Sequence, residues 1–432
     1  MTPAAQIQAS IELLDDIFDT GRPADRLISQ YFRARRYIGS KDKRSISKTI
    51  YQVLRQRLSF TYLLQKHELA VTPRFLVAVS LLKEELNLES YFDGVAYNPK
   101  PFSSDAFKSF RALDFLELDS APISVQLNIP EWLAPKLQKS LAENYVKEMK
   151  ALNCRANTDI RVNLLKVSMH DMVDLLESTT FECLQSKLSP WCIRFDQRVA
   201  LTSLDSFRQG YFEIQDEGSQ LLALASEASA GEKVVDFCAG AGGKSLAMAM
   251  MMNNKGVIYA CDVHSKRLEQ LSIRAKRAGV HNVRVHGLSS EHDKWIKQHR
   301  KMADLVLIDA PCSGTGTWRR NPDSRWNLKP EHLNNLLVLQ QSILQSASRL
   351  VKPGGRLLYA TCSLLAEENQ LQIEQFLANN LDFKYRKIEL PETTLSQLSA
   401  NEYQQHQLML STAISGTDGF YVCALQREAK II

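Results

Sequence analysis

The sequence predicts an α/β protein in three parts: a helical region over residues 1–120, a small α+β module over 121–215 and a Rossmann-like domain over 216–432. Two observations support this organisation. The 432 residues are 44% hydrophobic and 23% charged, a composition that can form about two to three buried cores. After residue 215, short apolar runs alternate with helical patterns of roughly 10–15 residues, which is typical of a doubly wound, mostly parallel sheet.

The first 120 residues show helical periodicity. Apolar side chains recur at helical spacing, as in Ile7, Ile11, Leu14 and Phe18, and again in Ile46, Ile50, Val53, Leu54 and Leu58. Pro23 and Pro73 separate the helical segments, because proline disfavours helical conformation in the residue before it. Residues 116–130 contain two prolines and no strong period, so we expect a connector there.

The rest of the chain predicts strands. In the small module, a strand is expected at 161–164, a helix at 169–177, and further strands at 191–195 and 211–214. In the last part, strands are expected at 234–237, 256–261, 283–285, 304–308 and 355–359. The run Lys352-Pro353-Gly354-Gly355 is expected to stop a helix before the fifth of these strands. Ligands bind at the carboxyl ends of the strands in such sheets.

Composition excludes several classes of protein. The longest apolar stretches, such as 246–252, are far shorter than the ~20 residues that cross a bilayer. The first residues lack the basic and apolar regions of a signal peptide. The eight cysteines contain no C-x-x-C pair and the histidines show no ligand spacing, so no metal site is predicted. We expect a cytoplasmic protein with free thiols.

Basic residues cluster near the N-terminus. Nine lysines and arginines lie between Arg33 and Arg57, against one acid, Asp42. Such a cluster can contact the phosphates of a nucleic acid, and it can equally be a solvated helix face. The residues expected to contact RNA are Arg35, Arg36, Lys43 and Arg44.

A glycine-rich turn follows the first strand of the Rossmann-like domain. It comprises Cys238, Ala239, Gly240, Ala241, Gly242, Gly243 and Lys244. Asp262 ends the second strand, where an acid can accept hydrogen bonds from a ribose. Ser245 stands where a dinucleotide-binding turn has its third glycine, so S-adenosylmethionine fits better than NAD.

Two cysteines and an acid follow the fourth and fifth strands. Asp309 ends the fourth strand, Cys312 comes three residues later, and Cys362 follows the fifth strand. Singly, each cysteine is more commonly an inert core residue. Strands four and five are neighbours in a sheet of methyltransferase order, so both thiols would lie side by side at the edge that binds ligands.

Paired thiols suit methylation at C5 of cytosine. This carbon is a poor nucleophile until a thiolate adds to C6. After methyl transfer the C5 proton must leave and the enzyme sulfur must be eliminated, and a second thiol can assist that release. An acid such as Asp309 can hydrogen-bond or protonate N3 as charge builds there.

The segments around these residues resemble a known family. DAPCSGTGTWRRNPDSRW and TCSLLAEENQ closely resemble motifs IV and VI of the RsmB/NOP/Sun family of RNA cytosine-5 methyltransferases. The resemblance extends over about residues 124–426 through VQLNIPEWL, RVNLLK, GYFEIQDEGSQLLAL, DFCAGAGGK and DGFYVCAL. It implies that Cys362 is the nucleophile, Cys312 the releasing thiol, and the small module ferredoxin- or RRM-like. The N-terminal part is similar to a NusB-like helical domain.

The chain departs from the family pattern at two turns. Gly240-Ala241 replaces the usual Ala-Pro, which keeps the turn possible. After the third strand the family has an acid that holds adenine, whereas here no aspartate precedes Asp293, so we expect Ser289 or the backbone to take this contact. Asp216 is interpreted as a helix N-cap rather than a border of the cofactor pocket.

The segment after Cys312 is expected to contact RNA, because arginines bind phosphates and tryptophan stacks on unpaired bases. The residues concerned are Arg319, Arg320, Arg325 and Trp326, and the alternative is a solvated loop with one packed tryptophan. The function predicted is cytidine-C5 methylation of RNA by a monomer, and the family resemblance implies ribosomal RNA as the substrate. Transfer RNA as substrate, a DNA cytosine methyltransferase and a non-catalytic RNA-binding or ribosome-assembly factor are the alternatives.

Overall fold

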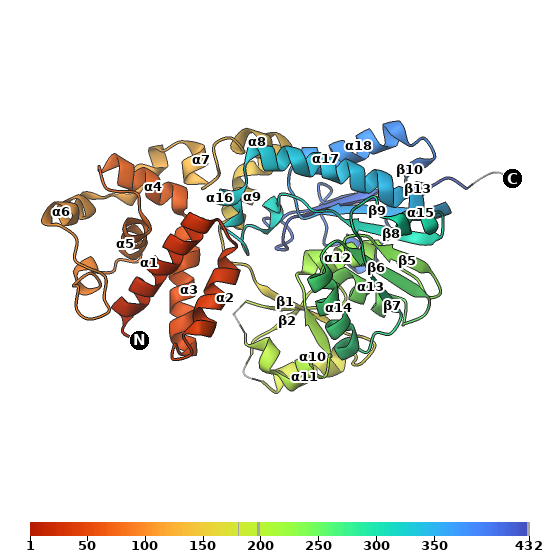
Figure 1. Cartoon of the computed structure of the whole chain (residues 1–432), viewed down its shortest axis with the longest axis horizontal. Coiled ribbons are helices and arrows are strands. Elements are labelled where there is room, and N and C mark those ends of the chain that lie inside the picture. Colours follow the sequence, from red (N-terminus) through yellow and green to blue (C-terminus); the bar gives the residue numbers. More distant parts are fainter. Residues whose placement is uncertain (180, 197–198, 430–432) are drawn as a thin grey trace. The chain divides into compact units, whose positions relative to one another are not determined.

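The computed structural model describes residues 1–179, 181–196 and 199–429. The chain forms two compact units, whose elements are labelled in Figure 1. The helical unit comprises Met1–Cys154 and Trp318–Leu328. The α/β unit comprises Arg155–Thr317 and Lys329–Ile432. No helix among the described residues is both long and apolar enough to cross a bilayer.

The helical unit confirms the helices that the sequence predicts in the N-terminal part. Thr2 caps the first helix by accepting a hydrogen bond from the Ala5 amide, and Gly21 ends it in the left-handed conformation. Apolar faces of the long helices form one core, which includes Leu14, Ile50 and Phe60. The elements are α1 (Pro3–Thr20), α2 (Ala24–Ala34), α3 (Ser40–Arg55), α4 (Arg57–Lys66), α5 (Pro73–Lys83), η1 (Leu88–Ser90), α6 (Ser104–Ala112), η2 (Phe115–Ser120), α7 (Ile123–Gln126), α8 (Ala134–Leu141), η3 (Ala142–Asn144), α9 (Tyr145–Leu152) and α16 (Ser324–Asn327).

The helical unit extends past residue 120, where the sequence predicts a boundary. The expected connector at 116–130 forms the short helices η2 and α7. Asn128 holds this stretch against α4, because its side-chain oxygen accepts hydrogen bonds from the Leu58 and Ser59 amides at 3.1 and 3.0 Å. Buried amide groups of this kind stabilise packing only when they are satisfied. The boundary between the two units therefore lies after Cys154.

A small antiparallel sheet in the α/β unit confirms the predicted α+β module. Its strands lie in the order β2-β3-β1-β4, with β1 antiparallel to both neighbours. Ile160, Ile193 and Phe212 pack with Met172 and Leu176 of α10. The elements are β1 (Thr158–Val162), α10 (Met169–Glu177), β2 (Leu184–Gln185), β3 (Cys192–Phe195), η4 (Leu201–Ser203), α11 (Asp205–Arg208) and β4 (Phe212–Ile214).

The large sheet confirms the doubly wound prediction. Its order is β11-β12-β13-β9-β8-β5-β6-β7, and the pairs from β9 to β7 are parallel. Its strands are β5 (Lys233–Asp236), β6 (Val257–Asp262), β7 (Val283–Gly287), β8 (Ala303–Asp309), β9 (Val351–Thr361), β10 (Phe383–Tyr385), β11 (Tyr403–Gln404), β12 (Gln407–Leu410) and β13 (Phe420–Arg427). Its helices are α12 (Glu217–Ala225), α13 (Gly243–Met251), α14 (Ser265–Ala278), α15 (Lys294–Gln298), η5 (Thr315–Thr317), α17 (Pro330–Ala347), η6 (Ser348–Leu350), η7 (Ala366–Glu368), α18 (Gln370–Asn379) and α19 (Glu392–Leu395).

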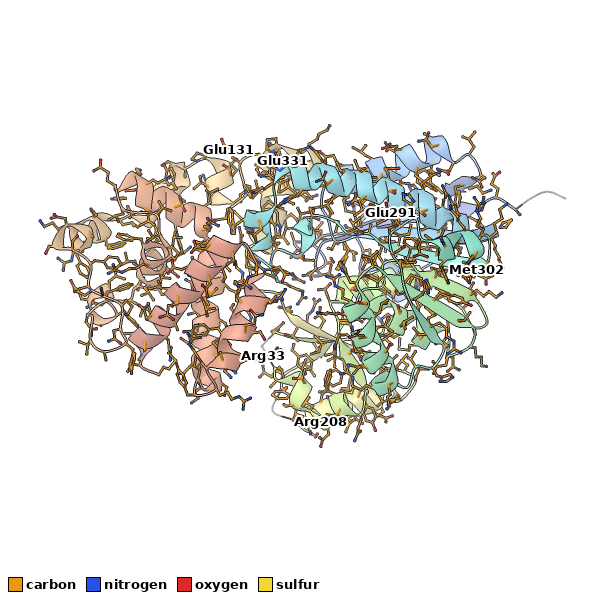
Figure 2. All side chains as sticks on the ribbon, viewed as in Figure 1. Arg33, Glu131, Arg208, Glu291, Met302 and Glu331 are labelled. Atoms are coloured by element: carbon orange, nitrogen blue, oxygen red, sulfur yellow. The ribbon has the colours of Figure 1, made fainter. Side chains whose placement is uncertain are left out.

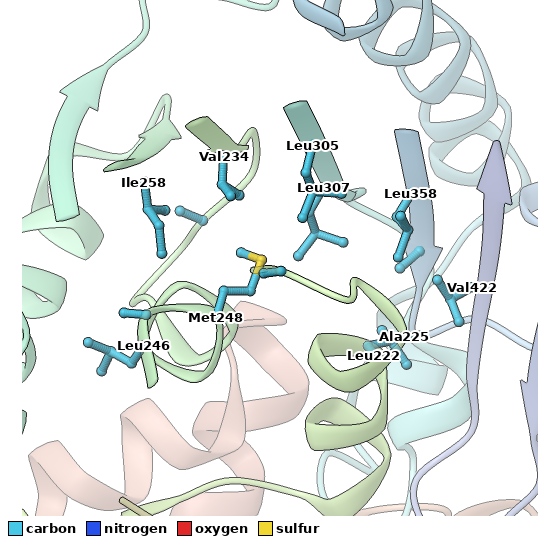
Figure 3. Close-up of a cluster of buried hydrophobic side chains, with 14 of the residues drawn as sticks. Leu222, Ala225, Val234, Leu246, Met248, Ile258, Leu305, Leu307, Leu358 and Val422 are labelled. Carbon is cyan, nitrogen blue, oxygen red and sulfur yellow. The ribbon is translucent and has the colours of Figure 1, made fainter. Parts of the chain in front are cut away.

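Alternate residues of the strands form a core on each face of the sheet. On one face, Val234, Leu307 and Leu358 meet Leu222 and Met248 of α12 and α13 (Figure 3). On the other face, Val235, Val306, Leu357 and Tyr359 pack against Ile343 and Phe376 of α17 and α18. Burial on both faces holds the strand ends rigidly at one edge of the sheet.

One local prediction was wrong. The run Lys352-Pro353-Gly354-Gly355 lies inside β9, which begins at Val351, instead of ending a helix. The helix α17 already ends at Ala347. The pairing with β8 shifts register between Ala303 and Leu305, and this irregularity accommodates the proline and the glycines within the strand.

Candidate active site

The turn between β5 and α13 carries two glycines with positive φ. Gly242 has φ 82°, and a Cβ atom there would lie 2.3 Å from Leu271 Cγ, so a larger residue does not fit. The Gly240 amide donates to Asp262 Oδ2 at 2.8 Å, and the His264 amide donates to Asp262 Oδ1 at 2.7 Å. Asp262 at the end of β6 therefore holds the turn in place.

A hollow of about 650 Å³ lies over this turn at the carboxyl ends of the strands. Its volume is in the range of small-molecule sites, roughly 300–1,000 Å³. Eight of the ten residues that the sequence predicts to bind the cofactor line this hollow. They are Cys238, Ala239, Gly240, Ala241, Gly243, Lys244, Asp262 and Asp309. Gly242 is not among the described residues that line the hollow; it packs against Leu271.

The structure does not place Ser289 in this hollow. Ser289 is exposed, is not among the described residues that line the hollow, and donates its hydroxyl to Asp293 at 2.6 Å. Asp216, in contrast, is the N-cap of α12 as expected, since its side chain accepts from the Gly218 amide.

An acid that sequence reasoning missed lines the hollow near the end of β7. Glu291 follows β7 by four residues and accepts a hydrogen bond from Ser342 of α17 at 2.9 Å. Figure 2 shows Glu291 beside that helix. A backbone hydrogen bond, and then the bond from Ser342, hold the pKa of Glu291 below its ordinary value. His264 and Arg267 also line the hollow. The signal available was an acid in the loop after the third parallel strand.

Lys244 and Asp309 form an ion pair inside the hollow. Lys244 Nζ donates to Asp309 Oδ2 at 2.7 Å; the lysine side chain is largely buried, whereas that of Asp309 is 32% exposed. Burial lowers the pKa of Lys244, but the charge and hydrogen bond of Asp309, together with the charges of Asp236 and Cys362, outweigh burial and raise this pKa above its ordinary value. A thiolate at Cys362 attracts the same ammonium group. The hollow thus contains a fixed positive charge next to the two thiols.

The two predicted thiols meet at adjacent strand ends. β8 and β9 are parallel neighbours with Asp309 opposite Ala360, and Cys312 and Cys362 follow these positions. Their sulfur atoms are 3.4 Å apart. The hydrogen bond with Cys362, then burial, then the charges of Cys362 and Glu368 raise the pKa of Cys312 well above its ordinary value. Cys312 is therefore a neutral thiol at neutral pH.

A buried carboxylate holds both cysteine loops. Glu368 is inaccessible to solvent and accepts hydrogen bonds from the Ser313 amide at 2.8 Å and from the Ser363 hydroxyl at 2.5 Å. Ser313 donates its hydroxyl to the same carboxylate. Ser313 and Ser363 each directly follow a cysteine in the chain, so Glu368 sets the relative position of the two thiols.

The loop of Cys312 is also held by a close backbone contact. The Gly316 amide donates to the Cys362 carbonyl at 3.0 Å, and the Gly419 amide donates to the Gly316 carbonyl at 2.9 Å. A Cβ atom on Gly316 would lie 2.1 Å from the Gly419 oxygen, so this approach requires glycine.

Comparison with known proteins agrees with this geometry. Residues 222–426 match the family described as 16S rRNA methyltransferase RsmB/F, and residues 129–202 match the ferredoxin-like domain of the RsmF/B-like proteins. The probable ribosomal RNA small subunit methyltransferase B of Synechocystis is 30% identical over 316 residues, 73% of this chain and 70% of that protein. The chain belongs to the RsmB/F methyltransferase family.

Other relatives agree with this membership. Ribosomal RNA small subunit methyltransferase B of Pasteurella multocida is 34% identical over 69% of this chain and 65% of that protein. A solved methyltransferase homologue from Pyrococcus horikoshii is 28% identical, with a TM-score of 0.59, and covers 73% of this chain and 100% of that chain. This RsmB/F member is an S-adenosylmethionine-dependent RNA methyltransferase.

The hollow fits the cofactor of the RsmB/F family. S-adenosylmethionine carries a ribose, an adenine and a charged amino-acid end. Asp262 oxygens each accept one backbone hydrogen bond and keep a lone pair for a ribose hydroxyl. The glycine turn allows close approach of the backbone, and Glu291 lines the hollow near the end of β7.

The arginines expected to contact RNA after Cys312 lie in the helical unit of this RsmB/F member. Arg325 is 1% exposed and donates to the Asn128 carbonyl at 3.0 Å and to Asn153 Oδ1 at 2.6 Å. The indole of Trp326 donates to the Leu54 carbonyl at 2.7 Å. Arg319 is buried too, and its carbonyl accepts from Arg55. The expected phosphate contact is therefore not met at Arg325, because burial removes its guanidinium from the surface.

Basic residues of the N-terminal cluster divide into two groups. Arg36 and Arg44 are exposed, while Arg35 and Lys43 are half-buried against the rings of Tyr31 and Phe32. Arg55 and Arg57 serve the fold, since Arg55 bonds to the Arg319 carbonyl and Arg57 packs 4.0 Å from the Phe18 ring centroid. RNA contact by the four predicted residues remains a prediction.

Proposed function

We propose that this protein methylates C5 of a cytidine in small-subunit ribosomal RNA through a covalent adduct between Cys362 and C6 of the base. The observation that carries the proposal is the 3.4 Å separation of the Cys312 and Cys362 sulfur atoms beside Asp309. Binding alone, or methylation of a nucleophilic exocyclic atom, requires neither thiol.

The first half of the reaction makes C5 nucleophilic. The Cys362 thiolate, which the ammonium of Lys244 attracts, adds to C6. Negative charge then develops on the base toward N3, where water can supply the proton; Asp309, ionised in its pair with Lys244, could donate a hydrogen bond there only after taking up a proton from solvent. S-adenosylmethionine supplies the methyl group that C5 receives.

The second half restores the aromatic ring. The C5 proton is lost to solvent, the C5–C6 double bond forms again and the bond between C6 and Cys362 breaks. The neutral Cys312 thiol lies within hydrogen-bond distance of the departing sulfur and can protonate it. Glu368 positions both cysteines for this exchange through Ser313 and Ser363.

Methyl transfer from labelled S-adenosylmethionine tests the proposal directly. The full chain is incubated with small-subunit RNA, transfer RNA and duplex DNA, each prepared without modification, and the products are digested to nucleosides. We expect 5-methylcytidine in small-subunit RNA and its loss with Cys362→Ala. Label in transfer RNA or DNA instead would reassign the substrate, and label in a nucleoside other than 5-methylcytidine would contradict the chemistry.

A further inference from the structure

A second hollow, of about 930 Å³, lies within the helical unit and is lined by Tyr31, Arg35, Tyr37, Tyr97 and Lys100 among others. We propose that this hollow binds an unpaired nucleotide in a single-stranded segment of the substrate RNA. The proposal rests on RNA being the substrate, and it concerns a site apart from the thiols and the glycine turn.

Two tyrosines on the hollow are exposed to an unusual degree. Tyr37 is 74% exposed and Tyr97 is 84% exposed, although large aromatic side chains are normally mostly buried. Both rings are free to stack on a planar group, because their faces are not used in the core. Stacking on aromatic rings is how proteins hold unpaired bases of any sequence.

The loops that carry these rings are anchored. The Asp93 side chain accepts from the Val95 amide and from the Asn98 side chain, each at 2.9 Å, which closes the turn that presents Tyr97. Arg74 donates to the Lys100 carbonyl at the end of the same loop. On the other side, Tyr37 precedes Ile38, which is 2% exposed and belongs to the core. Anchored loops reduce the entropic cost of ordering the two rings around a ligand.

The charges of the hollow favour RNA over an acidic or apolar partner. Arg35 lies 3.7 Å from the centroid of the Tyr31 ring, and Lys100 lines the opposite loop. The acid in the lining, Glu12, already accepts hydrogen bonds from Tyr31 at 3.1 Å and from Gln8 at 3.2 Å. Arg36, exposed, adjoins Tyr37 in the chain. Cations beside free aromatic rings suit phosphates beside unpaired bases.

Further exposed cations lie near Arg35 and Tyr37 in the sequence. Arg33 lies in the last turn of α2, as labelled in Figure 2, and Lys41 lies in the first turn of α3. Both are exposed. A strand of RNA whose base enters the hollow would have basic side chains available to its neighbouring phosphates.

Equilibrium binding to a short RNA tests the inference in the full-length protein. The probe is a fluorescein-labelled RNA of about twelve nucleotides without self-complementarity, compared with the same strand in a duplex. We expect Tyr37→Ala and Tyr97→Ala each to weaken single-strand binding roughly tenfold, because the ring that stacks on one base is removed. Tyr37→Phe and Tyr97→Phe should bind within about twofold of the wild type, since phenylalanine retains the ring. Duplex binding should change little.

Salt dependence separates stacking from a general reduction of charge or of fold. The alanine variants should keep the wild-type slope of log affinity against log salt, because every phosphate-binding cation is still present. Leu116→Ala, at a 70% exposed residue of the same unit, is the matched control and should change neither affinity nor slope. Thermal unfolding of each variant identifies any that fails to fold.

Two results would overturn the inference: wild-type affinity in the Tyr37→Ala, Tyr97→Ala double variant, or equal weakening by phenylalanine and alanine. Unchanged RNA binding together with abolished association with a ribosomal protein would identify a protein-binding surface instead. The readout is independent of the chemistry at C5. If the wild type bound the probe but formed no 5-methylcytidine, the proposed reaction would fail and the nucleotide site would stand.

Discussion

The sulfur of Cys312 lies 3.4 Å from the sulfur of Cys362, and the two residues follow neighbouring parallel strands. The hydrogen bond with Cys362, burial, and the charges of Cys362 and Glu368 raise the pKa of Cys312 well above its ordinary value, so Cys312 keeps its proton at neutral pH. A thiol that keeps its proton suits the release step that the proposed reaction gives to Cys312.

The first prediction concerns the roles of the two thiols. Cys312→Ala should allow attack and methyl transfer but impair elimination, so a covalent protein–RNA complex should accumulate and resist denaturing gel electrophoresis. Cys362→Ala and the double variant should form no complex, because the attacking sulfur is absent. Cys154→Ala, at an exposed cysteine of the helical unit, is the control. Trapping by Cys362→Ala alone would reverse the roles of the two thiols.

The second prediction concerns the carboxylate beneath the thiols. Glu368→Gln keeps the shape but removes an acceptor oxygen, so Ser313 and Ser363 are anchored less firmly. We expect kcat to fall about 10–100-fold with little change in KM for S-adenosylmethionine. Steady-state kinetics measure both constants. Glu367→Gln, at the neighbouring acid, should retain near wild-type kcat, and an equal fall there would rule out a specific role for Glu368.

The third prediction concerns pH and Asp236. Burial, opposed by the hydrogen bond from Ser245 and reinforced by Asp309, raises the pKa of Asp236 from 3.8 to about 7. The folded state therefore binds more protons than the unfolded state between these values, and stability attributable to Asp236 falls as the pH rises through this window. Asp236→Asn cannot ionise, so the Tm of the variant relative to the wild type should increase between about pH 4.5 and 7. If the difference in Tm between the variant and the wild type stayed constant over this pH range, the raised pKa of Asp236 would be contradicted.

The fourth prediction concerns Arg325. Its guanidinium is fully buried and satisfies the Asn128 carbonyl and the Asn153 side chain, and burial, followed by the charge of Arg55, lowers its pKa to about 9. Arg325→Ala leaves a cavity and unpaired acceptors, so we expect the free energy of unfolding, measured with urea, to fall by about 2–4 kcal/mol. Arg26→Ala, at an exposed arginine of α2, should cost less than about 0.5 kcal/mol.

The fifth prediction concerns the basic cluster. Replacing Arg35, Arg36, Lys43 and Arg44 by glutamine should weaken RNA binding and reduce its salt slope by about 0.7–0.9 for each phosphate that is no longer neutralised. Binding of S-adenosylmethionine should be unaffected, because its hollow lies in the α/β unit. Lys108→Gln, at an exposed lysine of α6, is the control. An unchanged slope would make the cluster a solvated helix face.

Local patterns predict most of the fold. The helix α10 has the predicted bounds, and the strands β5 to β8 lie within two residues of theirs, because each depends on short-range periodicity and turn residues. The antiparallel strands β10 to β13 were not predicted, because the other strands of this sheet were recognised by their alternation with helices and these four do not follow that pattern. The thiol pair was predicted because strand order alone brings the two strand ends together.

Long-range packing accounts for what sequence reasoning missed. The bond between Trp326 and the Leu54 carbonyl joins residues 272 positions apart, and nothing near Trp326 in the sequence indicates that partner. The arginines after Cys312 therefore led to the prediction of an RNA-binding surface, whereas Arg325 is a buried residue that stabilises the fold. Glu291 was missed because only an aspartate was expected in the loop after the third parallel strand, although a glutamate is present there and is held by Ser342 of α17.

The segment Trp318–Leu328 makes the helical unit discontinuous in the chain. A gene fragment that ends at Cys154 would encode a protein without the donors to Leu54 and Asn128. An exchange of N-terminal domains between family members would therefore need three crossovers within the gene, one after Cys154 and one on each side of the segment equivalent to Trp318–Leu328, because that segment must travel with its own domain. Recombination only after Cys154 would combine the N-terminal helices of one protein with the segment 318–328 of another. We therefore expect residues 1–154 and 318–328 to evolve together.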